Sequence, residues 1–164
     1  MLEKFVVCIK YQQSPASTSY FYYTHVIILL MSHQLVKELV SDILNLDDIM
    51  FSVNSGNGIC EVRIERGLPV RINDKWMTIG NEDKPWHIHL NLENVTTAKF
   101  VKETRQNGMN GYSVRFFDSN GNIAMRANFV KMYDYNGNLL PAKTRRYDEL
   151  FTKYGKREVI SFTP

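Results

Sequence analysis

Apolar residues recur every three to four positions between residues 35 and 44, which is the spacing of one face of an α-helix. They are Leu35, Val36, Leu39, Val40, Ile43 and Leu44. Ser32 can cap the amino end of this helix, because its hydroxyl oxygen accepts a hydrogen bond from a free backbone N–H group. Asp47 and Asp48 follow its carboxyl end. The pattern predicts one amphipathic helix that begins at Ser32.

Beyond residue 48 the apolar residues follow a period of two, which is typical of a half-buried β-strand. Seven runs of β-forming residues are predicted to be strands: 49–53, 59–64, 76–79, 86–90, 96–103, 112–117 and 123–132. In the second run, Cys60, Val62 and Ile64 are expected to face the core. Clusters of Asn, Gly and Asp separate several of the runs, and the Asn-Gly pair within 118–122 is a strong hairpin signal.

A second, short helix is predicted over residues 144–153, because Tyr147, Leu150, Phe151 and Tyr154 fall on one side of it. The strands follow one another through short turns, without the strand–helix–strand alternation of a parallel sheet. We therefore predict an α+β fold, in which a meandering antiparallel β-sheet is accompanied by one N-terminal amphipathic helix and a short C-terminal helix.

Residues 1–31 differ in composition from the rest of the chain. The apolar run over 20–31 is too short to cross a hydrocarbon core as a helix, and the polar residues before it do not fit a secretory signal. The β-branched and aromatic residues of 5–9 and 20–30 suit a pair of strands or an appended extension. We divide the chain into a leader or extension of doubtful order, 1–31, and a single domain, 32–164. One hypothesis is that the native start is Met31.

The composition is that of a globular protein, since 44% of the 164 residues are hydrophobic and 23% are charged. Lys and Arg exceed Asp and Glu by 20 to 17 and are interspersed with them, so neither a nucleic acid nor a membrane is predicted as a partner. The two cysteines, Cys8 and Cys60, form neither a CxxC pair nor a disulfide framework. This usage favours a reducing, cytoplasmic location.

Two of the four histidines, His87 and His89, lie two residues apart between Trp86 and Leu90. Side chains at positions i and i+2 of a strand share one face, and neutral imidazole is the commonest metal ligand in proteins. The pair is therefore a candidate metal site. The alternative is that both residues occupy the solvated face of a half-buried strand.

A second interpretation of the same histidines is a cupin-like, non-haem metal protein that uses His87, His89 and Glu93. The spacing His87-x-His89-x-x-x-Glu93 matches the first cupin metal motif. A cupin also needs a later histidine, and no histidine follows His89 in this sequence. The match therefore lacks its context.

The order of several motifs resembles one repeat of the HemS/ChuX/HutX haem-utilisation family. The similar segments are GNGICEVRIERGLPV at 56–70, the strand that contains Trp76, HIHLNLENVTTAKFVKE at 87–103 and GYSVRFFDSNGNIA at 111–124. The family has a histidine strand, a strand ending in a V-V-R-K-like sequence and an F-D-x-x-G hairpin. Their counterparts here are His89-Leu90, Phe100-Val101-Lys102, and Phe117-Asp118 with Gly121. The resemblance covers about residues 50 to 130.

The resemblance implies a cytoplasmic, homodimeric haem or tetrapyrrole binder or carrier that holds haem against an open antiparallel sheet. His89 would be the axial iron ligand, and His87 an alternative ligand or a distal hydrogen-bond donor. Arg115 and Arg126 would bind the haem propionates, and Lys102 and Arg63 are further cations for this role. An enzyme is less expected than a binding protein, because no second histidine or acid–base pair is placed to assist ring opening.

The sequence departs from the family at two positions. Duplicated members carry an axial histidine in a Q-I-H-T-G-like strand end, where this chain has Glu65 within 63–67. The aromatic-aromatic-glycine end of the last strand is replaced by Asn128-Phe129-Val130. These departures favour an alternative function, a cofactor-free dimeric scaffold or small-ligand module.

Overall fold

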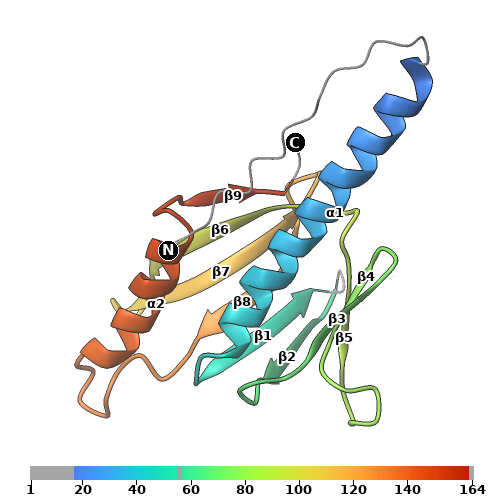
Figure 1. Ribbon diagram of the computed structural model, residues 1–164. Helices are drawn as coiled ribbons and strands as arrows, with labels where there is room; N and C mark the ends of the chain where they lie inside the picture. Colours follow the sequence, from blue (N-terminus) through green and yellow to red (C-terminus); the bar gives the residue numbers. More distant parts are fainter. Residues whose placement is uncertain (1–16, 55–56, 163–164) are drawn as a thin grey trace.

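The computed structural model describes residues 17–54 and 57–162, with side chains from residue 30 onward (Figure 1). Two helices and nine strands follow one another in this part of the chain. They are α1 (Ser17–Leu44), β1 (Ile49–Asn54), β2 (Ile59–Arg63), β3 (Val70–Asn73), β4 (Trp76–Ile79), β5 (Ile88–Asn91), β6 (Val95–Thr104), β7 (Asn110–Asp118), β8 (Ile123–Phe129), α2 (Pro141–Lys153) and β9 (Val159–Ser161). The predicted α+β class is confirmed.

Helix α1 is longer than the sequence pattern predicts, because it begins at Ser17 rather than at Ser32. The prediction of a strand over residues 20–30 is wrong, since the helix continues through this run. An apolar run rich in β-branched and aromatic residues does not by itself distinguish a strand from a helix, and a packed helical segment can extend into its neighbour at little further cost. The strand predicted over 5–9 lies outside the described residues.

The larger sheet has six strands in the order β2-β1-β8-β7-β6-β9, and every neighbouring pair is antiparallel. Both helices lie against the same face of this sheet (Figure 1). Phe51, Val114, Phe116, Met125 and Ala127 point from the strands into this covered face and are fully buried. We call the opposite, helix-free face of the six strands the outer face.

Helix α2 is attached to the sheet by aromatic packing. The ring of Tyr147 meets those of Phe100, Tyr112 and Phe129 edge to face, with centroid separations of 5.0 to 5.8 Å. Burial raises the pKa of the Tyr147 hydroxyl well above its usual range. This helix was predicted, although it begins at Pro141 rather than at residue 144.

A smaller sheet of three antiparallel strands, in the order β3-β4-β5, packs against α1. Its inward residues Met77, Ile79 and Leu90 belong to the same hydrophobic core as Val36 and Leu39 of α1. The sequence predicts β4 and β5 but misses β3, and it also misses β9. The two strands have only four and three residues, so a period of two repeats at most twice in each.

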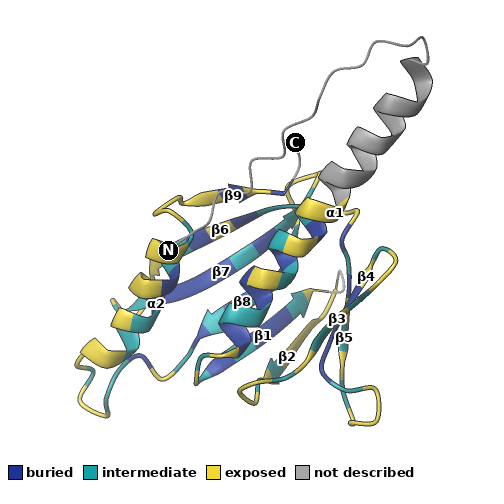
Figure 2. Ribbon diagram, in the orientation of Figure 1, coloured by how far each residue is buried: buried dark blue, intermediate teal, exposed yellow. Residues whose placement is uncertain are grey.

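The expectation that Cys60 is a core residue is wrong, because it is exposed in the structure. Its register partner is Val53, so its side chain is on the covered face as predicted. However, β2 is the edge strand of the sheet, and none of its five residues is buried (Figure 2). Period-two alternation indicates which face a residue occupies, but it does not indicate how far that face is covered.

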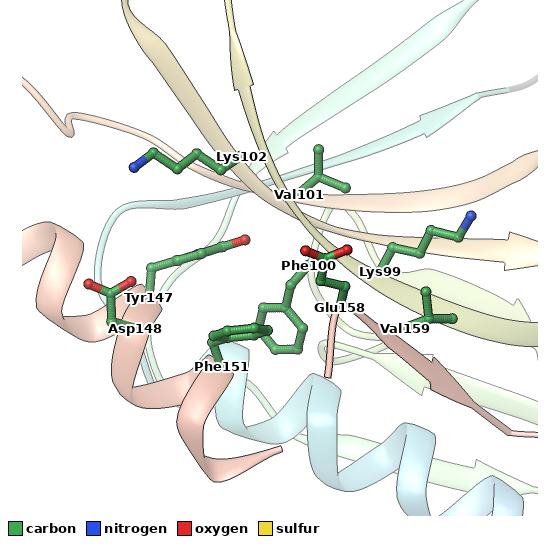
Figure 3. A pocket seen from close by; sticks show the side chains of 9 residues that line it. All are labelled: Lys99, Phe100, Val101, Lys102, Tyr147, Asp148, Phe151, Glu158 and Val159. Carbon is green, nitrogen blue, oxygen red and sulfur yellow. The ribbon is translucent and has the colours of Figure 1, made fainter. Parts of the chain in front are cut away.

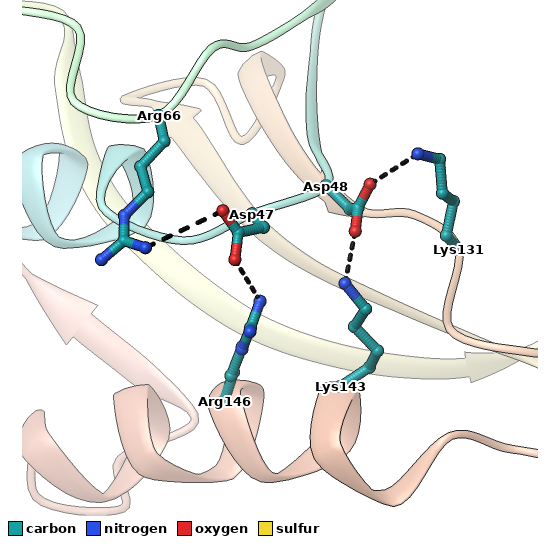
Figure 4. A network of polar contacts seen from close by, with 6 residues as sticks. All are labelled: Asp47, Asp48, Arg66, Lys131, Lys143 and Arg146. Atoms are coloured by element: carbon teal, nitrogen blue, oxygen red, sulfur yellow. Dashed lines mark hydrogen bonds and ion pairs between the residues drawn. The ribbon is translucent and has the colours of Figure 1, made fainter.

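Asp47 and Asp48 connect the α1–β1 turn to α2 (Figure 4). The Asp48 carboxylate accepts hydrogen bonds from the ammonium groups of Lys131 and Lys143, and Arg146 of α2 donates to Asp47 at 2.7 Å. The hydrogen bond from Lys131, then that from Lys143, lowers the pKa of Asp48.

Within residues 17–54 and 57–162, no helix has the length and apolar character needed to cross a membrane.

Candidate functional site

His89 stands on the solvent-exposed face of the three-stranded sheet, opposite Thr78 of β4. The Thr78 hydroxyl oxygen lies 3.0 Å from Nδ1 of His89. This hydrogen bond fixes the orientation of the imidazole ring, as the outer partner of a metal-binding histidine does. Among the described residues Nε2 of His89 has no hydrogen-bond partner, so this nitrogen is available to a ligand.

His87 precedes β5 by one residue, and its ring contacts the ring of His89. The two ring centroids are 4.7 Å apart, and the ring planes meet at 75°. The predicted proximity of the two imidazoles is therefore observed. Both residues are exposed.

A hollow of about 640 Å³ lies over the exposed face that carries His89. Arg71 and Asn73 of β3 and Trp76 and Thr78 of β4 share this face, because they are register partners on adjacent strands. Trp76 is 43% exposed, an unusually open position for so large an aromatic side chain. The volume falls within the range of small-molecule sites. The hollow therefore combines an imidazole, an indole and a guanidinium group.

Sequence reasoning misses Arg71 and Trp76 as site residues. Arg71 is on β3, which is not predicted, and its place beside Thr78 follows only from strand pairing. The run of alternating residues at 70–73 and the Asn73-Asp74 turn before Trp76 were the signals that could have revealed this hairpin. Arg71 also lies 3.8 Å from the carboxylate of Glu82.

Three of the four predicted propionate-binding cations lie on the outer face of the six-stranded sheet. Arg115 and Arg126 are register partners on β7 and β8, and Arg63 is on β2 opposite Met50. Arg115 donates to the carboxylate of Glu103 and, at 3.2 Å, to the hydroxyl of Ser113. These three arginines therefore belong to a different sheet from His89.

Lys102, the fourth predicted cation, is placed on the other side of the six-stranded sheet. Its Nζ lies 5.4 Å from the centroid of the Tyr112 ring. It borders a hollow of about 530 Å³ between β6 and α2, into which the rings of Phe100, Tyr147 and Phe151 project (Figure 3). In one copy of the chain, the structure thus separates the six predicted site residues into three groups.

The alternative ligand set of His87, His89 and Glu93 is not assembled. The Glu93 carboxylate pairs with Lys75 at 3.6 Å, and the described part of the chain contains no group of three His, Cys, Asp or Glu side chains that could hold a metal ion. Glu65, at the family's histidine position, is an exposed residue that follows the end of β2.

Comparison with known proteins supports the resemblance noted in the sequence. A family model matches residues 37–155, and together with similar solved structures this match supports a ChuX/HemS-like haem-utilisation family. A ChuX structure has a TM-score of 0.62 at 14% identity, and the match covers 77% of this chain and 75% of the ChuX chain. A second, titled as the haem-binding protein ChuX, has a TM-score of 0.57 at 16% identity, with coverages of 70% and 69%.

A longer protein shares the fold over part of its length. Holo-PhuS, titled as a haem-binding protein from Pseudomonas aeruginosa, has a TM-score of 0.52 at 14% identity over 71% of this chain. The match covers 32% of PhuS. No curated protein matches the sequence.

Proposed function

The chain belongs to the ChuX/HemS-like haem-utilisation family, and from this premise we propose that it is a cytoplasmic haem- or tetrapyrrole-binding protein that acts as a carrier. Two solved relatives are titled as haem-binding proteins. Haem is the cargo in this proposal, and its iron requires an axial ligand from the protein.

The observation that carries the proposal is the environment of His89. Thr78 engages Nδ1, so that Nε2 is left for a metal, and the ring borders an open hollow beside the indole of Trp76. An aromatic surface suits the apolar macrocycle, and a guanidinium group suits a propionate. We propose His89 as the axial ligand and Arg71 as a cation near it. His87 would be an alternative ligand or a distal hydrogen-bond donor.

The cations Arg63, Lys102, Arg115 and Arg126 remain proposed propionate partners. Because they lie on other surfaces of the chain than His89, one copy does not offer them together with the histidine. We propose a homodimer, in which a second copy supplies these cations to haem held on the first. The single histidine pair supports binding and transport more than ring opening.

Titration of the purified protein with haemin tests the proposal. We expect a shifted Soret band that saturates at one haem per chain. The band should shift position and weaken in His89→Ala, whereas His33→Gln, a buried histidine on α1, should leave it unchanged. Absence of a Soret shift in the wild-type protein would contradict haem binding and support a cofactor-free module. An identical shift in the double variant His87→Ala/His89→Ala would contradict iron ligation by this histidine pair.

A further inference from the structure

The outer face of the six-stranded sheet carries an unusual row of like charges. Across β8, β7 and β6, the residues directly opposite one another are Arg126, Arg115 and Lys99. Like charges in directly opposed positions of an antiparallel sheet are destabilising. Sequences that break such a local rule without a structural gain often do so at functional sites.

Two of these three cations are compensated within the chain. Arg115 is paired with the Glu103 carboxylate, and the ammonium group of Lys99 lies 4.9 Å from the centroid of the Phe117 ring. Arg126 is half-buried, and within the described residues its guanidinium group has no ion pair or hydrogen bond. The row therefore leaves one half-buried guanidinium group that is not part of an ion pair.

Arg126 borders a hollow of about 280 Å³ on this face. Ser52 and Glu61 line it beside Arg126, and Asn128 completes a hydrogen-bonded chain. The Asn128 amide donates to the Ser52 hydroxyl at 2.7 Å, and that hydroxyl donates to the Glu61 carboxylate at 3.2 Å. These polar groups are therefore held in place before any ligand arrives, which lowers the entropic cost of binding.

A second guanidinium group, that of Arg105, reaches the same hollow from the β6–β7 turn. A Cβ atom at Gly111 would lie only 2.6 Å from Nε of Arg105. The absence of a side chain at Gly111 thus makes the space in which Arg105 lies against β7. Among the described residues Arg105 also has no carboxylate partner.

From this arrangement we infer that the hollow on the outer face is a binding site for a carboxylate group, held by Arg126 and Arg105. Two guanidinium groups against the single carboxylate of Glu61 leave one positive charge, which suits a monoanion. The planar guanidinium fork matches a carboxylate in a bidentate arrangement. Met50, Ile59, Ile123 and Val130 also line the hollow, so the ligand is expected to have a short apolar portion.

This inference does not depend on haem ligation by His89. The carboxylate can come from a free small acid or from a haem propionate, because both present the same group. Titration of the ¹⁵N-labelled full chain with hexanoate, followed by NMR, tests the site itself. We expect saturable shifts of the backbone amides of Ser52, Arg126 and Asn128, and about tenfold weaker binding in Arg126→Gln, as expected for loss of a charge-assisted hydrogen bond.

Three controls separate this site from non-specific binding. Gly111→Ala should weaken hexanoate binding because it displaces Arg105, whereas Arg145→Gln, an exposed arginine on α2, should not. Hexanamide, which has the same chain without the charge, should not bind. Equal binding of hexanamide and hexanoate, unchanged binding in Arg126→Gln, or no saturable shift with hexanoate would overturn the inference.

Titration with haemin and with its dimethyl ester identifies the source of the carboxylate. A weaker affinity of Arg126→Gln for haemin alone, with the ester unaffected, would support the site with a propionate as its ligand. Hexanoate binding that depends on Arg126, without any effect of Arg126→Gln on haemin, would support it with a free acid as its ligand. Failure of haem ligation would be detected separately, in the Soret band of the wild-type protein.

Discussion

The exposed face of the three-stranded sheet and the outer face of the six-stranded sheet carry different chemical groups, although the two faces are built alike. Both are helix-free faces of antiparallel strands. The smaller one offers an imidazole whose Nδ1 is already bonded to Thr78, next to an exposed Trp76. The larger one offers arginines in adjacent strands and a hydrogen-bonded amide–hydroxyl–carboxylate chain. The two sets of side chains fit the proposed division between metal ligation on the smaller sheet and anion binding on the larger one.

The variant with the largest expected effect, His89→Ala, tests this proposed division directly. His89→Ala should lower haemin affinity by about 100-fold or more, since loss of the iron ligand exceeds the 10- to 100-fold effect typical of outer-sphere partners. Arg126→Gln should change haemin affinity by less than about tenfold. Absorbance titration of both variants measures the two effects. A larger loss in Arg126→Gln than in His89→Ala would reverse the assignment of the two faces.

A smaller effect is expected at the residue that orients the imidazole. Thr78→Val preserves the shape of the side chain but removes the hydroxyl bonded to His89 Nδ1, and we expect about a tenfold loss of haemin affinity. The same substitution should leave hexanoate binding at the outer face unchanged. If haemin affinity is unaltered, then the Thr78 contact does not contribute to the ligand's orientation.

Stability is expected to depend on pH where α1 packs against the smaller sheet. His33 of α1 is buried, with Nε2 unpartnered within the described residues, and desolvation lowers its pKa despite the opposing charges of Glu93 and Asp74 from the smaller sheet. Its lowered folded-state pKa means that the unfolded chain binds more protons below about pH 6.5. Stability should therefore fall as the pH drops below this value.

Urea denaturation at several pH values between 7.5 and 5 measures this loss, and hydrogen exchange should locate it first in β4 and β5. His33→Leu should remove the part of the pH dependence that comes from this residue. Carboxylates such as Asp48, whose pKa is lowered by Lys131 and Lys143, contribute mainly at lower pH. An unchanged profile in His33→Leu would show that His33 does not couple the sheet to α1.

The smallest effect concerns the stability of the outer face. Arg126→Gln removes a cation directly opposite Arg115, so we expect the free energy of unfolding to rise by about 0.2 to 1 kcal/mol. Thermal or urea unfolding of this variant and of Arg145→Gln provides the comparison. A stabilised protein with weakened hexanoate binding would show that Arg126 is kept for binding at a cost in stability. A destabilised one would indicate that Arg126 supports the sheet.

The candidate sites were predicted unevenly. The contact between His87 and His89 is local, and a period of two places both side chains on one face without knowledge of the fold. The group formed by Arg71, Trp76 and His89 depends on the pairing of three strands, so periodicity alone does not reveal it. The sequence identified Arg63, Arg115 and Arg126 as cations on strands. It did not show which sheet carries them, because that depends on which strands pair.

The sequence by itself determined the apolar stripe of α1, most of the strands, the antiparallel hairpins and the identity of the histidine pair. These features arise from interactions between residues close together in the chain, and they leave periodic signals. Only the tertiary structure decided that β3 completes the smaller sheet, that Cys60 is exposed at a sheet edge, and that the histidines and arginines occupy different faces. Such outcomes depend on pairing and burial between distant segments, which no local pattern encodes.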